Sequence, residues 1–260
     1  MKYHIAVKTH HKTGTNWMNN IFEGFADRVG VEYIHLSQVK DIQERKELLE
    51  QAAQGKEYKI FFHPYGRFPK VRIKNRMKFR GIHVVRDPRD MILSSAKYHQ
   101  WSDEAWLHEP DEKFNGKTYQ QALNELTTLD EQVLFEMNNS AAHHINMMHN
   151  FDAQNIFFNI KFEEMRQDTD LMLWHRILLR LGLEAADLAP AMELFVQNSI
   201  QFGKLKKTSH IQDTSVLPWV RKFPTTQFSV FDEKFGEITQ ALGYPATSVV
   251  MSEVKARETT

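Results

Sequence analysis

The chain has 260 residues, of which 42% are apolar, 25% charged and 12% aromatic, a composition typical of a globular protein with a sizeable core. Its 33 basic and 33 acidic side chains balance to a net charge of zero, so no nucleic-acid partner is expected, because such binding needs a basic excess. The absence of cysteine excludes disulfides and thiolate chemistry and favours a cytoplasmic location. No apolar run reaches the roughly 18 residues of a membrane span, and the start of the chain turns polar too quickly for a signal peptide.

The first half of the chain alternates short apolar runs with amphipathic segments. Strands are predicted at residues 3–7, 31–36, 58–62 and 81–85, and helices at 14–29 and 42–53. Another helix is predicted after the fourth strand, where Asp87 is a good N-cap and Pro88 suits the first turn. Such alternation of strands and helices predicts a parallel sheet with helices on its faces.

The second half is mostly helical in pattern. Thr118 and Gln121 have capping-box spacing before a helical pattern that runs to about Met148. One more strand is predicted at 155–160, and helices at 171–183, 188–196 and 231–242. Residues 204–225 are interpreted as a functional loop, since loops longer than about 15 residues usually have a role. We predict one α/β domain over residues 1–251, with a polar tail at 252–260.

A candidate anion site follows the first strand. Residues 10–17 join this strand to a helix, whose N-terminus offers backbone N–H groups and partial positive charge, and Lys12 adds a full charge. The segment is not a Walker A loop, because Lys12 precedes its single glycine, Gly14. The alternative interpretation is a plain strand–helix turn with an exposed lysine.

A second candidate site follows the fourth strand. Arg86 lies at the carboxyl end of that strand, the edge at which ligands bind in open α/β folds, and Ser94 lies about two turns into the next helix. An arginine fork with a hydroxyl suits one phosphate group. The alternative is that Arg86 pairs with Asp87 or Asp90 and that Ser94 packs within the helix.

Together the two segments resemble a known family. Residues 12–17, Lys-Thr-Gly-Thr-Asn-Trp, are similar to the Lys-Ser/Thr-Gly-Thr-x-Trp loop of sulfotransferases that use 3′-phosphoadenosine 5′-phosphosulfate (PAPS). Arg86 with Ser94 resembles the 3′-phosphate motif of that family, and residues 162–165 resemble its Tyr-Glu-Asp/Glu-Leu/Met. The resemblance implies a P-loop-like three-layer fold and sulfuryl transfer from PAPS to a hydroxyl or amine of a small-molecule acceptor, with no metal.

The resemblance also implies roles for single residues. Lys12 would contact the phosphosulfate and stabilise charge on the bridging oxygen, where negative charge develops. Trp17 would stack on adenine, unless it serves only as core packing, and Arg86 with Ser94 would bind the 3′-phosphate. Four loop residues would cradle the 5′-phosphate: Thr13, Gly14, Thr15 and Asn16.

The candidate general base is His63, which follows the third strand and precedes Pro64. Relatives often have a histidine between the two cofactor motifs, and a histidine of near-neutral pKa can take a proton from an acceptor hydroxyl or amine. His10 and His11 flank the anion loop and are rival bases, and some relatives use a glutamate instead. A hydrogen-bonded loop histidine is the non-catalytic alternative.

The resemblance weakens toward the C-terminus. The Arg-x-Gly-x-x-Gly-x-Trp stretch that covers the cofactor in the family aligns here with residues 212–218, which lack the arginine and both glycines. Phe202 is a candidate for a second ring on adenine. Replacement charge would come from Arg221 and Lys222, with Lys204, Lys206 and Lys207 nearby, unless this is only a solvated basic loop. Two other functions therefore stay open: a P-loop-like kinase or hydrolase, and a non-catalytic nucleotide-binding protein of the same fold.

Overall fold

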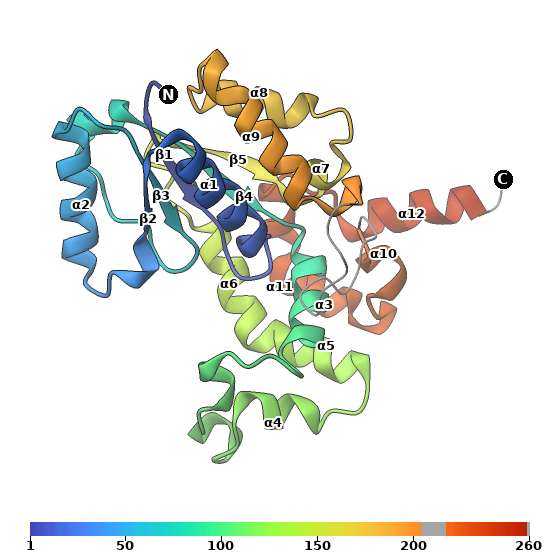
Figure 1. Ribbon diagram of the computed structural model, residues 1–260. Helices are drawn as coiled ribbons and strands as arrows, with labels where there is room; N and C mark the ends of the chain where they lie inside the picture. Colours follow the sequence, from blue (N-terminus) through green and yellow to red (C-terminus); the bar gives the residue numbers. More distant parts are fainter. Residues whose placement is uncertain (204–216, 259–260) are drawn as a thin grey trace. The chain divides into compact units, whose positions relative to one another are not determined.

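The computed structural model describes residues 1–203 and 217–258, and it divides into two compact units (Figure 1). The first unit comprises residues 1–86 and 150–216, and the second comprises residues 87–149 and 217–260. Lys204, Lys206, Lys207 and the part of the expected cofactor-covering stretch at 212–216 lie outside the described residues. Among the described residues, no helix is long and apolar enough to cross a membrane.

A five-stranded parallel sheet forms the centre of the first unit, in the order β2-β3-β1-β4-β5. The strands are β1 (His4–Lys8), β2 (Glu32–His35), β3 (Lys59–His63), β4 (Phe79–Val85) and β5 (Phe157–Lys161). Every residue of β1 is buried, because this central strand has covered faces on both sides. The predicted parallel sheet is confirmed, with strand ends that differ by one or two residues from the predicted ones.

Helices cover both faces of this sheet. On one face, α1 (Thr15–Val29), α8 (Met172–Arg180) and α9 (Ala185–Asn198) bury Phe22, Trp174 and Phe195 in one cluster with Val7 and Phe62. On the other face, α2 (Ile42–Gln54) contributes Leu49, Ala52 and Ala53 to a cluster around Phe61 and Phe79. The unit also contains α7 (Phe162–Gln167) and the 3-10 helices η1 (Leu36–Gln38), η2 (Ile73–Lys78) and η5 (Ile200–Phe202).

The described part of the second unit is helical. Its α-helices are α3 (Pro88–Tyr98), α4 (Tyr119–Asn124), α5 (Leu129–Asn138), α6 (Ser140–His149), α10 (Trp219–Lys222), α11 (Phe228–Ala241) and α12 (Thr247–Glu258). Its 3-10 helices are η3 (Ala105–His108), η4 (Glu112–Phe114) and η6 (Thr225–Gln227). The predicted start of α3 is confirmed, since Asp87 accepts a hydrogen bond from the Arg89 N–H at 2.9 Å and Pro88 opens the helix.

Three segments of this unit differ from the prediction. The capping box of Thr118 and Gln121 is confirmed, but the helix that it starts is short. A second capping box, between Thr128 and Glu131, starts α5, so the predicted long helix is three helices. The described part of the predicted loop at 204–225 contains α10 and the first residue of η6, and α12 extends into the predicted polar tail.

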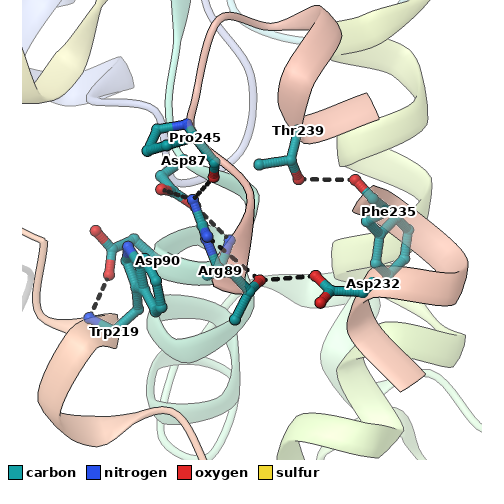
Figure 2. A network of polar contacts seen from close by, with 9 residues as sticks. Asp87, Arg89, Asp90, Trp219, Asp232, Phe235, Thr239 and Pro245 are labelled. Carbon is teal, nitrogen blue, oxygen red and sulfur yellow. Dashed lines mark hydrogen bonds and ion pairs between the residues drawn. The ribbon is translucent and has the colours of Figure 1, made fainter. Parts of the chain in front are cut away.

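Arg89 is a buried residue that connects several segments of the second unit (Figure 2). Its fully buried guanidinium binds both carboxylate oxygens of Asp87, at 2.8 and 2.7 Å, and donates to the Pro245 carbonyl at 3.0 Å. It also lies 3.8 Å from the ring centroid of Trp219, whose backbone N–H donates to Asp90 at 2.8 Å. These contacts join α3 to α10 and to the segment before α12.

Candidate active site

The turn between β1 and α1 is held by its own hydroxyls. The Thr13 hydroxyl accepts from the His10 N–H at 2.8 Å and donates to the His10 carbonyl at 3.0 Å, and the Thr15 hydroxyl donates to the same carbonyl at 2.9 Å. Lys12 has the left-handed φ of 63° that this tight turn requires. The two threonine side chains therefore shape the turn, which leaves backbone N–H groups as the donors that this loop offers to an anion.

The N-terminus of α1 has no side-chain cap. Gly14 is the N-cap residue, and the first turn carries no acidic residue. The first N–H groups of a helix have no partner within the helix, so this end combines donors with partial positive charge. Gly14 has a φ of 93°, and a Cβ there would lie 2.9 Å from the Phe162 ring. The structure thus fits a phosphate at the predicted place.

Arg86 lies against this loop. Its Nη1 donates to the Lys12 carbonyl at 2.7 Å, and its guanidinium lies 4.6 Å from the ring centroid of Phe162. The Arg86 Nε is buried and has no hydrogen-bond partner among the described residues. Asp87, named as an alternative partner of Arg86, forms its ion pair with Arg89. The structure therefore brings together Lys12 and Arg86, which are distant in sequence.

The two predicted adenine-stacking rings, Trp17 and Phe202, lie beside the same core residue. The Trp17 ring lies 5.4 Å from that of Phe195, and the Phe202 ring lies 6.4 Å from it. The Trp17 Nε1 donates to the Ser199 hydroxyl at 3.2 Å. Both rings are partly exposed and pack against the core, so each has a surface left for a ligand.

His63 is enclosed at the end of β3. Its side chain is 0% exposed, neither ring nitrogen has a hydrogen-bond partner among the described residues, and its ring meets Phe68 edge-on at 5.7 Å. Burial, and then the charge of Lys8, lower the pKa of His63 to about 3. This differs from the near-neutral pKa expected for a base, because water does not solvate the charged ring. The rivals are buried too: His10 Nε2 lies 2.8 Å from His83 Nε2, and His11 is 5% exposed.

The other predicted cofactor contacts belong to the second unit. Ser94 is partly exposed on α3, whereas Arg221 and Lys222 are exposed on α10. Their part in donor binding stays a prediction. Across residues 1–203 and 217–258, no cluster of three or more histidine, aspartate or glutamate residues has the arrangement of a metal site.

A polar cavity of about 420 Å³ adjoins the first turns of α1. It is lined by residues of α1, β2, η1 and the end of β3: Thr15, Asn16, Asn19, Glu23, Tyr33, His35, Gln38, Phe62, Pro64 and Tyr65. The Tyr33 hydroxyl donates to the Asn19 side-chain oxygen at 2.8 Å, and burial with the nearby charge of Glu23 raises the pKa of Tyr33. Such a lining offers many hydrogen-bond donors and acceptors to a small molecule.

The structure places three further residues at this edge of the sheet: Lys8 and His83, for which no role was predicted, and Phe162, the first residue of the segment that resembles the family motif. Phe162 supports both Gly14 and Arg86, Lys8 lies in the interior at the end of β1, and His83 lies beside it on β4. A signal for Lys8 was present, since a lysine that directly follows the apolar Ile5, Ala6 and Val7 at the end of a central strand is unusual. Nothing in the local pattern of β4 distinguishes His83.

Comparison with known proteins gives a consistent result. The sulfotransferase domain family matches residues 2–242. No curated protein sequence matches the chain. Among solved structures, mouse sulfotransferase SULT7A1 complexed with PAP has a TM-score of 0.56 and 15% identity, over 100% of this chain and 90% of that one.

A retinol dehydratase, solved with androsterone and the inactive cofactor PAP, has a TM-score of 0.51 and 11% identity, over 94% of this chain and 82% of that one. These likenesses show the fold, a P-loop-like parallel sheet flanked by helices. The family match covers nearly the whole chain, with the anion loop and Arg86 inside it. The chain therefore belongs to the sulfotransferase domain family.

Proposed function

We propose that this sulfotransferase moves the sulfuryl group of PAPS to a hydroxyl or amine of a small polar acceptor, with Lys12 and the start of α1 at the donor and His63 as the base. The observation that carries the proposal is the uncapped N-terminus of α1, which lies next to Lys12 and to Arg86, the residue that contacts the Lys12 carbonyl. Three sources of positive charge thus meet at one turn.

The residues have separate tasks in this proposal. When bound, PAPS supplies an electrophilic sulfuryl group on a phosphate leaving group. The N–H groups of residues 14–17 hold an anionic oxygen of the 5′ side, and the ammonium of Lys12 stabilises the charge that develops there. Arg86 binds a further phosphate, with Ser94 as the partner expected from the family resemblance. Trp17 and Phe202 supply ring surfaces for the base.

The acceptor site in this proposal is the polar cavity beside α1. Phe62, Pro64 and Tyr65 line it, whereas the ring of His63 lies on the other side of β3 from Phe62, against Phe68. Its lining of amide, hydroxyl, imidazole and carboxylate groups suits an acceptor rich in hydrogen-bonding groups. His63 would take the proton of the acceptor as the acceptor oxygen or nitrogen bonds to sulfur, while the bond from sulfur to the bridging phosphate oxygen breaks and adenosine 3′,5′-bisphosphate leaves. The cytoplasmic location predicted from the absence of cysteine stays a prediction.

Calorimetry of adenosine 3′,5′-bisphosphate tests donor binding. Micromolar binding is expected, with adenosine 5′-monophosphate and ATP–Mg²⁺ binding at least about tenfold more weakly, a difference of about 1.4 kcal/mol. Arg86→Ala should abolish binding, whereas Arg28→Ala should not, because Arg28 is a half-exposed arginine of α1 that pairs with Glu193. A preference for ATP–Mg²⁺ would instead support the kinase or hydrolase alternative.

Turnover of PAPS tests the chemical role of Lys12. Lys12→Ala should lower kcat by at least about a hundredfold, since removal of one preorganised charge typically costs this much. Intact turnover in the purified variant would show that the mechanism is wrong.

One observation favours the non-catalytic alternative, namely the complete enclosure of His63. Bisphosphate binding without turnover across a wide panel of acceptors would support that alternative.

A further inference from the structure

Polar residues stand in one row across the sheet, near the carboxyl ends of its strands. Lys8 on β1 is paired in register with His63 on β3 and with His83 on β4, and His83 is paired with Asn159 on β5. Residues paired across a parallel sheet point to the same face, and neighbouring strands lie about 4.8 Å apart. Lys8 therefore stands between two histidines, one of which is the proposed base.

Hydrogen bonds that start at Asn159, the β5 residue of the row, hold these side chains in place. His83 Nδ1 lies 2.9 Å from the Asn159 side-chain oxygen, so Nδ1 donates and the neutral ring has Nε2 as an acceptor. The proton between His83 Nε2 and His10 Nε2, which are 2.8 Å apart, then belongs to His10. The Lys8 ammonium donates to the Thr9 carbonyl at 2.8 Å, and its side chain is 0% exposed.

The charge of Lys8 is not balanced within this row. Among residues 1–203 and 217–258, no carboxylate forms an ion pair with Lys8, and burial lowers its pKa to about 7. The groups that face it are His63 from β3 and His83 from β4, with His10 beyond His83. The charges of Arg45 from α2 and His35 from β2 also lower the pKa of His63. A proton on Lys8 thus disfavours a proton on either histidine.

We propose that Lys8 is a positioning residue whose protonation state sets the strength of His63 as a base. The inference rests on the proposed function. When Lys8 is an ammonium, repulsion across the strand pair prevents His63 from holding a proton. When Lys8 is a neutral amine, this repulsion is gone. The O–H or N–H bond of the acceptor then breaks and its proton passes to His63. The acceptor oxygen or nitrogen bonds to sulfur as the bond from sulfur to the bridging phosphate oxygen breaks, and adenosine 3′,5′-bisphosphate leaves.

The rate should therefore follow the titration of Lys8. Its midpoint near pH 7 implies that kcat/KM for PAPS, which reports the groups of the free enzyme, rises about tenfold from pH 6 to pH 8. In Lys8→Met, which removes the charge and keeps the length, kcat/KM should change less than about twofold over this range. In Lys8→Arg, which keeps the charge, kcat/KM should stay low from pH 6 to pH 8. Equal pH profiles for the wild type and Lys8→Met would overturn the proposal.

Nuclear magnetic resonance tests the coupling without turnover. Selective ¹³C labelling of lysine Cε and histidine Cε1 gives titration curves of both groups in the protein without PAPS, with His63→Gln assigning the His63 signal. We expect Lys8 to titrate within about one pH unit of 7 and the pKa of His63 to rise by at least about one unit in Lys8→Met. A Lys8 midpoint near 10 in the wild type would overturn the proposal even if the variants did not fold.

The two experiments also separate this inference from the proposed function. A coupled titration in a protein without turnover would mean that the row exists and that the sulfotransferase mechanism fails. Turnover with an uncoupled His63 would mean that Lys8 has a structural role only.

Discussion

Gly14 must satisfy two conditions at the start of α1. Its φ of 93° is in the left-handed region, and the place of a Cβ is 2.9 Å from the Phe162 ring. A side chain there would strain the backbone and displace the aromatic ring on which Arg86 rests. The backbone conformation and the closeness of Phe162 therefore explain why the family motif has a glycine at this position.

Gly14→Ala should lower the free energy of unfolding by about 1–3 kcal/mol and weaken binding of adenosine 3′,5′-bisphosphate, because the ring supporting Arg86 is pushed aside. Gly30→Ala is the matched control: Gly30 also has a positive φ, 67°, but its Cβ would meet nothing within 4 Å. The control should cost about 1 kcal/mol and leave binding unchanged. Urea unfolding measures the stability of the two variants, and calorimetry measures their binding. Equal losses of affinity in Gly14→Ala and Gly30→Ala would contradict this explanation of Gly14.

The helices of this protein differ in whether a side chain caps their N-terminus. Capping side chains satisfy the first turns of α2, α3, α4 and α5, through Asp41, Asp87, Thr118 and Thr128. The start of α1 has no such side chain, although it is one of the longest helices. The N-cap residues of α7, α8, α10 and α11 also make no side-chain capping hydrogen bond, so it is the adjacent Lys12 and Arg86 that distinguish the start of α1 as a site for an anion.

Arg89→Met tests the element-level role of the interior network. The variant leaves the buried Asp87 carboxylate without its bidentate partner, so the free energy of unfolding should fall by about 3–5 kcal/mol. Arg28→Met breaks the more exposed pair with Glu193 and should cost less than about 1 kcal/mol. Urea unfolding of both variants measures the difference. A loss at Arg89 as small as that at Arg28 would show that the network does not hold α3 in place.

At the scale of the whole molecule, buried bases make folding sensitive to acid. Burial lowers the pKa of His63 to about 3 and that of His83 to about 4. Between pH 6.5 and these values, the unfolded chain binds more protons than the folded chain, so stability falls as pH falls, by about 1.4 kcal/mol per pH unit for each group. Lys8 acts in the same direction from about pH 10.5 down to its folded pKa of about 7.

His83→Gln tests this dependence. The slope of the free energy of unfolding between pH 6.5 and 4.5 should fall by about 1.4 kcal/mol per pH unit, whatever the variant does to stability at neutral pH. His143→Gln changes an exposed histidine of α6 and should leave the slope unchanged. Urea unfolding at several pH values gives the slopes. A His83→Gln slope equal to that of the wild type would mean that His83 is protonated within the folded protein.

Features that depend on local sequence pattern could be predicted without the structure. Apolar runs and helical periodicity predicted the parallel sheet and its covering helices, and Asp87 with Pro88 predicted the start of α3. The anion loop was also local, since its turn, its lysine and its helix follow one another directly. The extent of the long helix was missed, because the restart at Thr128 interrupts the backbone without interrupting the helical pattern of apolar residues.

Which of these residues meet depends on packing between segments that are distant in the sequence. Arg86 donates to the carbonyl of Lys12, and Phe162 lies against Arg86 and Gly14, although no local pattern links the three segments. The row of His63, Lys8 and His83 exists because three strands pair in one register. Register and burial are set by packing across the whole sheet. For the same reason His63, which as a loop histidine would titrate near neutrality, has a pKa of about 3 in the interior.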